Sequence, residues 1–187
     1  MPEQLHNGKK GMWPGEPVSK EVMMPYLKEK FSRGMLNGKI LFALAYPGLF
    51  RAAEKLFTLR ICRYDHIVKP IRLRAAFDGV LCEQEVREGD LLLGSYNSGN
   101  EVVDRQSAIY GGLSIIFHLH HIRLHYCHFD RNRPLANFYY HTPKPAEGVL
   151  LHLMKALDII INESGPFREE RCRPLLEAIE TQLYHEL

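Results

Sequence analysis

The chain has 187 residues, a length that suits one medium-sized domain or one domain with a small appendage. Its 24 basic and 22 acidic residues nearly balance, and no basic tract marks a nucleic-acid-binding segment. The polar first residues lack the core of a signal peptide, and every apolar run is far shorter than the roughly 20 residues of a transmembrane helix. The four cysteines show no CxxC spacing, which favours reduced thiols over a zinc ribbon or a disulfide scaffold. We expect a soluble, cytoplasmic protein with no membrane partner.

Residues 1–55 are predicted to form an N-terminal arm followed by helical or irregular structure. Ser19 is suited to cap a short helix that ends near Phe31. The segment 39–56 predicts a strand, a turn at Pro47-Gly48 and a short helix.

Residues 56–142 are predicted to form a β-sandwich. Apolar and polar residues alternate in several short segments, as they do in half-buried strands. Gly, Asn and Asp break these segments, and no βαβ rhythm is visible, which indicates an antiparallel sandwich or barrel. Asp78-Gly79 and Gly89-Asp90 are expected to be structural turns. The expected strands are 57–64, 71–75, 80–86, 91–93, 101–104, 108–110, 113–118 and 138–141.

Residues 143–187 are predicted to form a helical hairpin. Apolar residues recur at helical spacing from Val149 to Ile161, and Gly165-Pro166 ends that helix. A second helix follows, with Pro174 either in its first turn or at a kink. The apolar stripe is wide enough both to cover the sheet and to form a dimer contact. The residues expected at a dimer interface are Leu150, Met154, Leu157, Ile161, Leu176 and Leu183.

The stretch 111–131 contains five of the chain's ten histidines. In a strand, His118 and His120 would point to the same face, as two metal ligands do in metal-dependent cupins, although the next acidic residue is only Asp130. If the strand continues, Ile122 and Leu124 share that face. The opposite, more polar face is then suited either to bind an anion or to lie exposed on an edge strand. That opposite face carries His121, Arg123, His125 and Cys127.

Several short motifs occur in a characteristic order. Phe77 and Gly79 precede the step Gly89-Asp90-Leu91-Leu92-Leu93, then comes Ile115-Ile116-Phe117-His118, and the helical pair follows. In this order the chain resembles, over about residues 56–187, the cupin-like effector-binding and dimerisation domain of AraC-type (AraC/XylS family) transcriptional regulators. The family's Pro-Pro-Gly loop is replaced by Ser95–Asn100, and its pair of helix-turn-helix motifs is absent from this chain.

The resemblance implies a small-molecule effector, a sugar or an organic acid, that enters the sandwich of a homodimer. It implies no catalytic residue and no cofactor, and DNA binding only through a C-terminal domain absent from this chain. An alternative is a metal-dependent cupin enzyme that uses His118 and His120, and a third is a stand-alone sugar-binding or assembly module with no output domain. The inward strand positions expected to line the effector pocket are Phe77, Leu91, Leu93, Ile116, His118 and His120.

Overall fold

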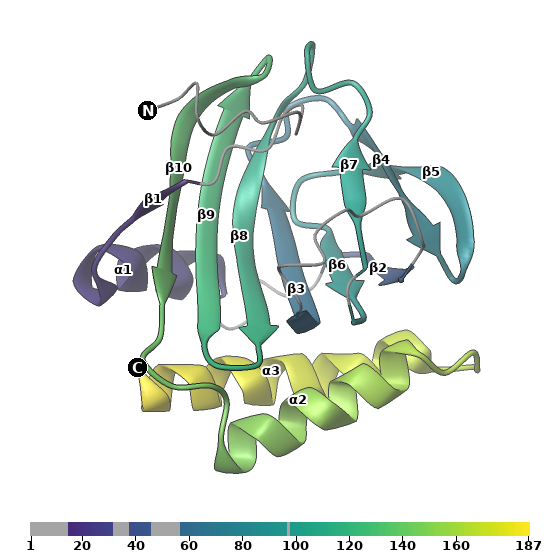
Figure 1. Ribbon diagram of the computed structural model, residues 1–187. Coiled ribbons are helices and arrows are strands. Elements are labelled where there is room, and N and C mark those ends of the chain that lie inside the picture. The colour runs from purple at the N-terminus through teal and green to yellow at the C-terminus, as the bar shows by residue number, and fades with distance from the viewer. Residues whose placement is uncertain (1–14, 32–37, 46–56, 97) are drawn as a thin grey trace.

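The computed structural model describes residues 15–31, 38–45, 57–96 and 98–187. This part of the chain forms ten strands and three helices (Figure 1). The helices are α1 (Lys20–Lys30), α2 (Gly148–Ile161) and α3 (Arg168–Glu186). The strands are β1 (Glu16–Pro17), β2 (Ile40–Leu44), β3 (Phe57–Asp65), β4 (Ile71–Phe77), β5 (Val80–Val86), β6 (Leu91–Gly94), β7 (Asn100–Val102), β8 (Ile109–His118), β9 (Ile122–Asp130) and β10 (Arg133–His141). The prediction of a mostly β fold that ends in a helical hairpin is confirmed.

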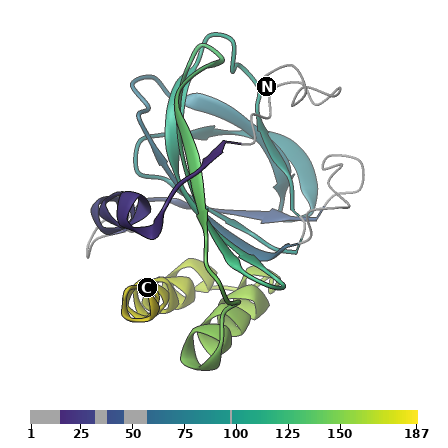
Figure 2. The ribbon, with the colours of Figure 1, turned by 60° about the vertical axis from the view of Figure 1, so that its left-hand side comes forward.

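All ten strands belong to one sheet, in the order β1-β10-β9-β8-β3-β6-β2-β4-β5, with β7 paired to β4. Most neighbours are antiparallel, as expected, but β2 pairs with β6 and β1 with β10 in parallel. The sheet curls on itself, and the three helices lie outside the curl (Figure 2). Strands β1 and β2 come from residues 1–55, so the sheet includes part of that region. The expected turn at Pro47-Gly48 and the helix after it lie outside the described residues.

Two turns have the backbone that their sequences predict. Phe77 pairs with Val80, so Asp78 and Gly79 form a two-residue hairpin loop between β4 and β5. Both loop residues have positive φ, 53° and 83°, which such a tight hairpin requires. Before β6, the Asp90 carboxylate accepts a 2.9 Å hydrogen bond from the backbone N–H of Arg87. Both segments are therefore structural turns, as expected.

Strand alternation gives the sheet two different faces. The outer face packs against the helices, and the inner face is the one around which the sheet curls (Figure 2). Buried apolar residues on the outer face join the helices in one core, while a second core fills the inner face between β2, β3, β4 and β6. The outer core includes Ile61, Leu91, Leu93, Leu113, Ile115, Phe117, Ile122 and Leu124. The inner core includes Leu41, Ala43, Cys62, Tyr64, Leu73, Phe77 and Leu92.

Helix α1 begins at the residue that the sequence predicts. The Ser19 hydroxyl accepts a 3.3 Å hydrogen bond from the N–H of Val22, which is the geometry of an N-cap. Met23 and Leu27 anchor the helix in the outer core. The Tyr184 hydroxyl donates to the Leu27 carbonyl at 3.0 Å, so α1 is also tied to α3.

Helices α2 and α3 lie side by side near the β8–β9 turn (Figure 1). Pro174 lies inside α3 and not at its start. The structure places all six residues expected at a dimer interface inside this one chain, each at most 5% exposed and packed in the outer core. Their apolar side chains therefore stabilise the hairpin on the sheet. These residues are Leu150, Met154, Leu157, Ile161, Leu176 and Leu183. In the described part of the chain, no helix is both long and apolar enough to cross a membrane.

Candidate functional site

The chain reverses direction within the histidine stretch. Strand β8 ends at His118, β9 begins at Ile122, and the backbone N–H of His118 donates to the carbonyl of His121 at 2.9 Å. The prediction that His118 and His120 share one strand face is therefore wrong, because His120 lies exposed in the turn. In β9 the predicted alternation is confirmed for Ile122 and Leu124, which lie in the outer core.

His118 lies instead with the polar residues of the opposite face. Its ring stacks on that of His121, with 4.6 Å between the centroids. The His121 ring is 4.1 Å from that of His141, which is 4.7 Å from the ring of Tyr139. The guanidinium of Arg123 lies 4.3 Å from the centroid of the Tyr139 ring. We call these five residues the rim cluster, because they gather where β8 ends, β9 begins and β10 ends.

Antiparallel pairing explains why these residues meet. Arg123 pairs with Ile116 on one side and with His141 on the other, so the ends of β8, β9 and β10 lie in register. Tyr139, two residues before His141, points to the same face by strand alternation. Sequence reasoning placed His141 in a strand but did not connect it with Arg123. The register between β9 and β10 is the signal that would have revealed the contact.

Two imidazoles of the rim cluster, those of His121 and His141, have basic neighbours that shift their pKa values. Burial lowers the pKa of His121, and His118, Arg123 and His120 lower it further. Burial also lowers the pKa of His141 to about 4, with added repulsion from His121, Arg123 and His118. Burial and these basic neighbours therefore disfavour the protonated form of both imidazoles.

Further polar side chains lie along the inner face. A 2.6 Å hydrogen bond joins His125 Nε2 and Asn137 Oδ1. The Ser114 hydroxyl donates to Cys62 Sγ at 3.2 Å. Burial raises the pKa of the Cys127 thiol to about 12, so this thiol is protonated and unreactive at neutral pH. All four cysteines are free, as expected for reduced thiols.

The structure divides the six residues expected to line an effector pocket. Ile116 and His118 lie on the inner face of the sheet, as Arg123 does. Phe77 is buried in the inner core. Leu91 and Leu93 lie on the outer face beneath the helices, so Leu92 is the residue of β6 that points inward. His120 is exposed in the β8–β9 turn.

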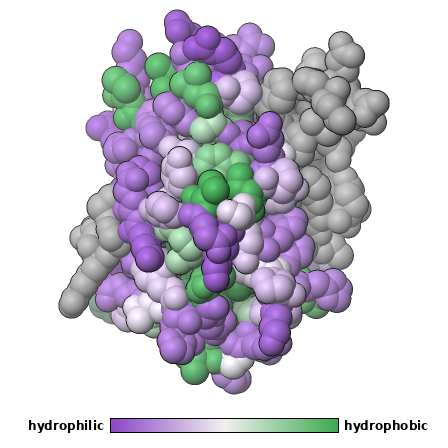
Figure 3. Space-filling view, turned by 90° about the vertical axis from the view of Figure 1, so that its left-hand side faces the viewer, coloured by the Kyte–Doolittle hydropathy of each residue, from purple (hydrophilic) through white to green (hydrophobic). Residues whose placement is uncertain are grey.

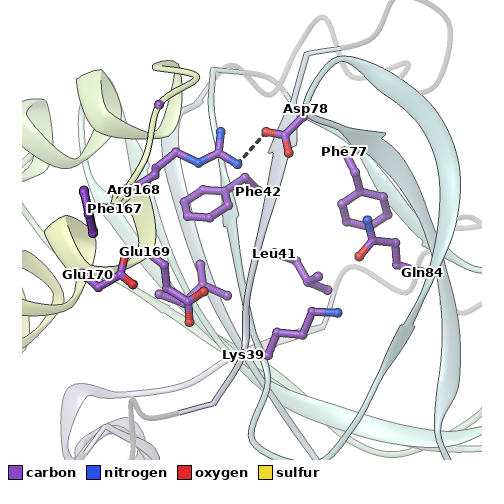
Figure 4. A pocket seen from close by; sticks show the side chains of 12 residues that line it. Lys39, Leu41, Phe42, Phe77, Asp78, Gln84, Phe167, Arg168, Glu169 and Glu170 are labelled. Carbon is purple, nitrogen blue, oxygen red and sulfur yellow. Dashed lines mark ion pairs between the residues drawn. The ribbon is translucent and has the colours of Figure 1, made fainter.

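Phe77 also lines a hollow of about 390 Å³ between the sheet and the start of α3 (Figure 4). Arg168 lines this hollow. Its guanidinium forms an ion pair with Asp78 at 2.6 Å and lies 3.8 Å from the ring centroid of Phe42. It also donates to the carbonyls of Ile161 and Glu163 at the end of α2. Arg168 thus joins the helical hairpin to the β4–β5 turn, which is a structural role.

A second group of stacked imidazoles lies on the outer face, near α1. The rings of His66 and His128 are 3.9 Å apart and almost parallel, and the Tyr126 hydroxyl is 2.6 Å from His66 Nε2. The Tyr126 ring in turn lies 4.6 Å from that of Tyr26 in α1. We call His66, His128 and Tyr126 the α1 cluster. Sequence reasoning missed His66, which lies outside the histidine-rich stretch.

Neither histidine cluster has the arrangement of a metal centre. Among the described residues, no group of three or more His, Cys, Asp or Glu side chains is placed to hold a metal ion. Comparisons of the chain with protein-family models, with curated proteins and with solved structures return no match. A functional inference for this chain therefore rests on its sequence motifs and on its geometry alone.

Proposed function

We propose that the chain is the effector-binding and dimerisation domain of an AraC-type transcriptional regulator that works in the cytoplasm. The motif order from Phe77 to His118, the mostly β fold and the helical hairpin support this proposal together. In this function, a small molecule binds to the sheet and changes the packing of the helices. DNA contact belongs to a helix-turn-helix segment outside the chain.

The observation that carries the proposal is the double role of β8 and β9. Ile115, Phe117 and Leu124 pack in the same core as α2 and α3. Their neighbours Ile116, His118 and Arg123 face the opposite side. Because alternate residues of a strand point to opposite faces, a ligand that displaces this hairpin also displaces the support of the helices. An effector that binds one arrangement more tightly then shifts the equilibrium between two arrangements.

The outward face of the helical hairpin is the surface that we propose for dimerisation. A shallow hollow of about 480 Å³ lies between α2 and α3, and its apolar lining includes Val149, Leu153 and Ala178. Val149 is 58% exposed. On the face over β1, β10 and α1, by contrast, hydrophobic residues form only a narrow, broken column among hydrophilic ones (Figure 3).

Sedimentation equilibrium tests the dimer. The chain should sediment with twice its monomer mass, and Val149→Glu should weaken the association at least about tenfold, because a charge would be buried at the contact. Val68→Glu is the matched control, since Val68 is 82% exposed between β3 and β4. A chain that remains monomeric at every concentration would contradict dimerisation through this face.

The regulatory part of the proposal is tested by the reading frame after the codon for Leu187. A continuation that encodes two helix-turn-helix motifs supports it, and a stop codon directly after Leu187 overturns it. Metal analysis of untagged protein gives an independent check. Stoichiometric Fe, Mn, Ni or Zn that disappears in a His118→Ala/His120→Ala variant would favour the alternative of a metal-dependent cupin enzyme.

A further inference from the structure

We propose that the hollow at the start of α3 binds a short peptide with free termini, a zwitterion of dipeptide size. This site is separate from the β8–β9 hairpin and goes beyond the function proposed above. Three properties of the hollow support it. Its walls are fixed by packing, two opposite charges line it from different elements, and a side-chain amide lines it from the sheet.

The walls of the hollow are held by contacts within the chain. Its volume of about 390 Å³ lies in the range of about 300 to 1,000 Å³ that small-molecule sites have. Phe42 and Phe77 line it and are only 7% and 5% exposed. The guanidinium of Arg168 is already paired with Asp78 and lies on the ring of Phe42. These four residues therefore shape the hollow and leave the ligand contacts to other side chains.

Two side chains of opposite charge line the hollow from different elements. Lys39 directly precedes β2, and Glu170 lies in the first turn of α3. Neither side chain forms a hydrogen bond or an ion pair with another described residue, whereas Glu169 is paired with Arg173. Figure 4 shows Lys39 on the side of the sheet and Glu170 on the side of α3. A ligand with a carboxylate at one end and an ammonium at the other complements both charges.

The side-chain amide of Gln84 in β5 lines the same hollow and forms no hydrogen bond with another described residue. It has donors and an acceptor, which match the C=O and N–H of a peptide bond. An extended dipeptide spans about 7 Å and carries one peptide bond between its charged ends. A sugar would leave both charges of the hollow without a partner of opposite sign, and a simple acid would leave one. The lining therefore favours a dipeptide.

Glycylglycine and two matched analogues are suitable probes. 5-Aminopentanoate has the same number of atoms between its charges but no peptide bond, and N-acetylglycylglycinamide has peptide bonds but no charge. Binding is measured by NMR through the backbone amide signals of the whole chain, and glycylglycine should shift those of Phe42, Gln84 and Glu170. 5-Aminopentanoate should bind about threefold more weakly, because it lacks the hydrogen bonds to Gln84. N-acetylglycylglycinamide should bind at least about tenfold more weakly, because it loses both charge pairs.

Variants locate the two charges. Lys39→Met and Glu170→Gln should each weaken glycylglycine binding about fivefold, the effect of losing one ion pair near the surface. Both residues are exposed, so neither change removes a buried contact. Lys69→Met and Glu147→Gln are the matched controls, because Lys69 and Glu147 are exposed and do not line the hollow. Both control variants should bind glycylglycine as tightly as the unchanged chain.

Four results would overturn the proposal. Glycylglycine could leave the signals of the hollow in place, or 5-aminopentanoate could bind as tightly as glycylglycine. N-acetylglycylglycinamide could bind as tightly as glycylglycine, or binding could survive Lys39→Met and Glu170→Gln unchanged. None of these measurements depends on the dimer or on the reading frame after Leu187, so this site and the regulatory function can fail separately.

Discussion

The two histidine clusters have similar ring contacts but opposite surroundings. At the rim cluster, ring centroids lie 4.1 to 4.7 Å apart, and at the α1 cluster the stacked imidazoles lie 3.9 Å apart. Only bases act on His121 and His141, whereas Glu88 and Glu29 raise the pKa of His66 against the lowering by burial and by Lys30. Stacked imidazoles alone therefore do not define a site.

The α1 cluster has its own partners, which is why we treat it as structural. The Tyr126 hydroxyl binds His66, and Tyr26 of α1 covers the Tyr126 ring. Nearby, Asp65 is only 2% exposed and forms ion pairs with Arg63 at 3.4 Å and Lys30 at 3.6 Å. Its pKa is raised by burial, which outweighs the opposing effect of these two cations. At the rim cluster, the charged groups that shift the pKa values of His121 and His141 are basic side chains.

The largest effect is expected from removing a cation beside that buried acid. Arg63→Met should destabilise the chain by about 3 kcal/mol, because the buried Asp65 carboxylate then loses its ion pair with Arg63 and keeps only the one with Lys30. Urea unfolding measures the loss. Arg133→Met is the control: Arg133 pairs with Asp130 at the surface, so its loss should change stability little. Equal effects of both changes would show that the region near α1 is not held by buried charge.

Tyr126→Phe should cost about 1.5 kcal/mol, because His66 loses a hydrogen-bond partner in a partly buried position. Urea unfolding again gives the free energy, and the His66 Cε1–H signal should shift while that of His141 does not. A shift of the His141 signal would mean that the two clusters are coupled through β9. That result would contradict the view that the α1 cluster and the rim cluster are independent.

Ser19→Ala removes the N-cap of α1 and should cost about 1 kcal/mol. Since α1 lies over Tyr126, amide hydrogen exchange should become faster in α1 and leave β8 and the rim cluster unchanged. Ser19→Asp, which can accept the same hydrogen bond from Val22, should restore slow exchange. Failure of this rescue would assign the effect to something other than the cap.

The smallest effect is the dependence of stability on pH. The pKa of His141 is about 4 in the folded chain and about 6.5 in the unfolded chain, so the unfolded chain binds more protons between these values. Stability should therefore fall as the pH decreases from about 6.5 to about 4. As the pH decreases, the urea midpoint of His141→Gln should fall less steeply than that of the unchanged chain. The same measurement on His128→Gln gives the part of the pH dependence that comes from the α1 cluster. An unchanged slope in His141→Gln would contradict the repulsion that distinguishes the rim cluster.

Much of the fold follows from local sequence. Alternating apolar residues predicted β3 and β4, because one side of each strand faces a core. Asp78-Gly79 predicted a tight turn because Gly tolerates positive φ and Asp does so more readily than most residues. Ser19 predicted the start of α1 because its hydroxyl satisfies a free backbone N–H.

Local sequence also determined that polar and apolar residues alternate along β9. It did not determine where the hairpin turns, and a shift of one residue moves every following side chain to the other face. The turn after His118 therefore decided that His118 meets His121 and that His120 lies in solvent. Strand alternation in β6 likewise decided that Leu91 and Leu93 lie on the outer face beneath the helices and that Leu92 lies on the inner face.

Tertiary structure alone decided which distant residues share a site. His141 reaches Arg123 only because β10 pairs with β9 in that register, and His66 reaches His128 only because β3 pairs with β8 and β8 with β9. Tertiary structure also packed the apolar stripe of α2 and α3 against the sheet, whereas the sequence favoured a dimer interface for it. A sequence pattern fixes what a side chain needs, burial or a charge partner. Only the packing of distant strands and helices determines which neighbour supplies it.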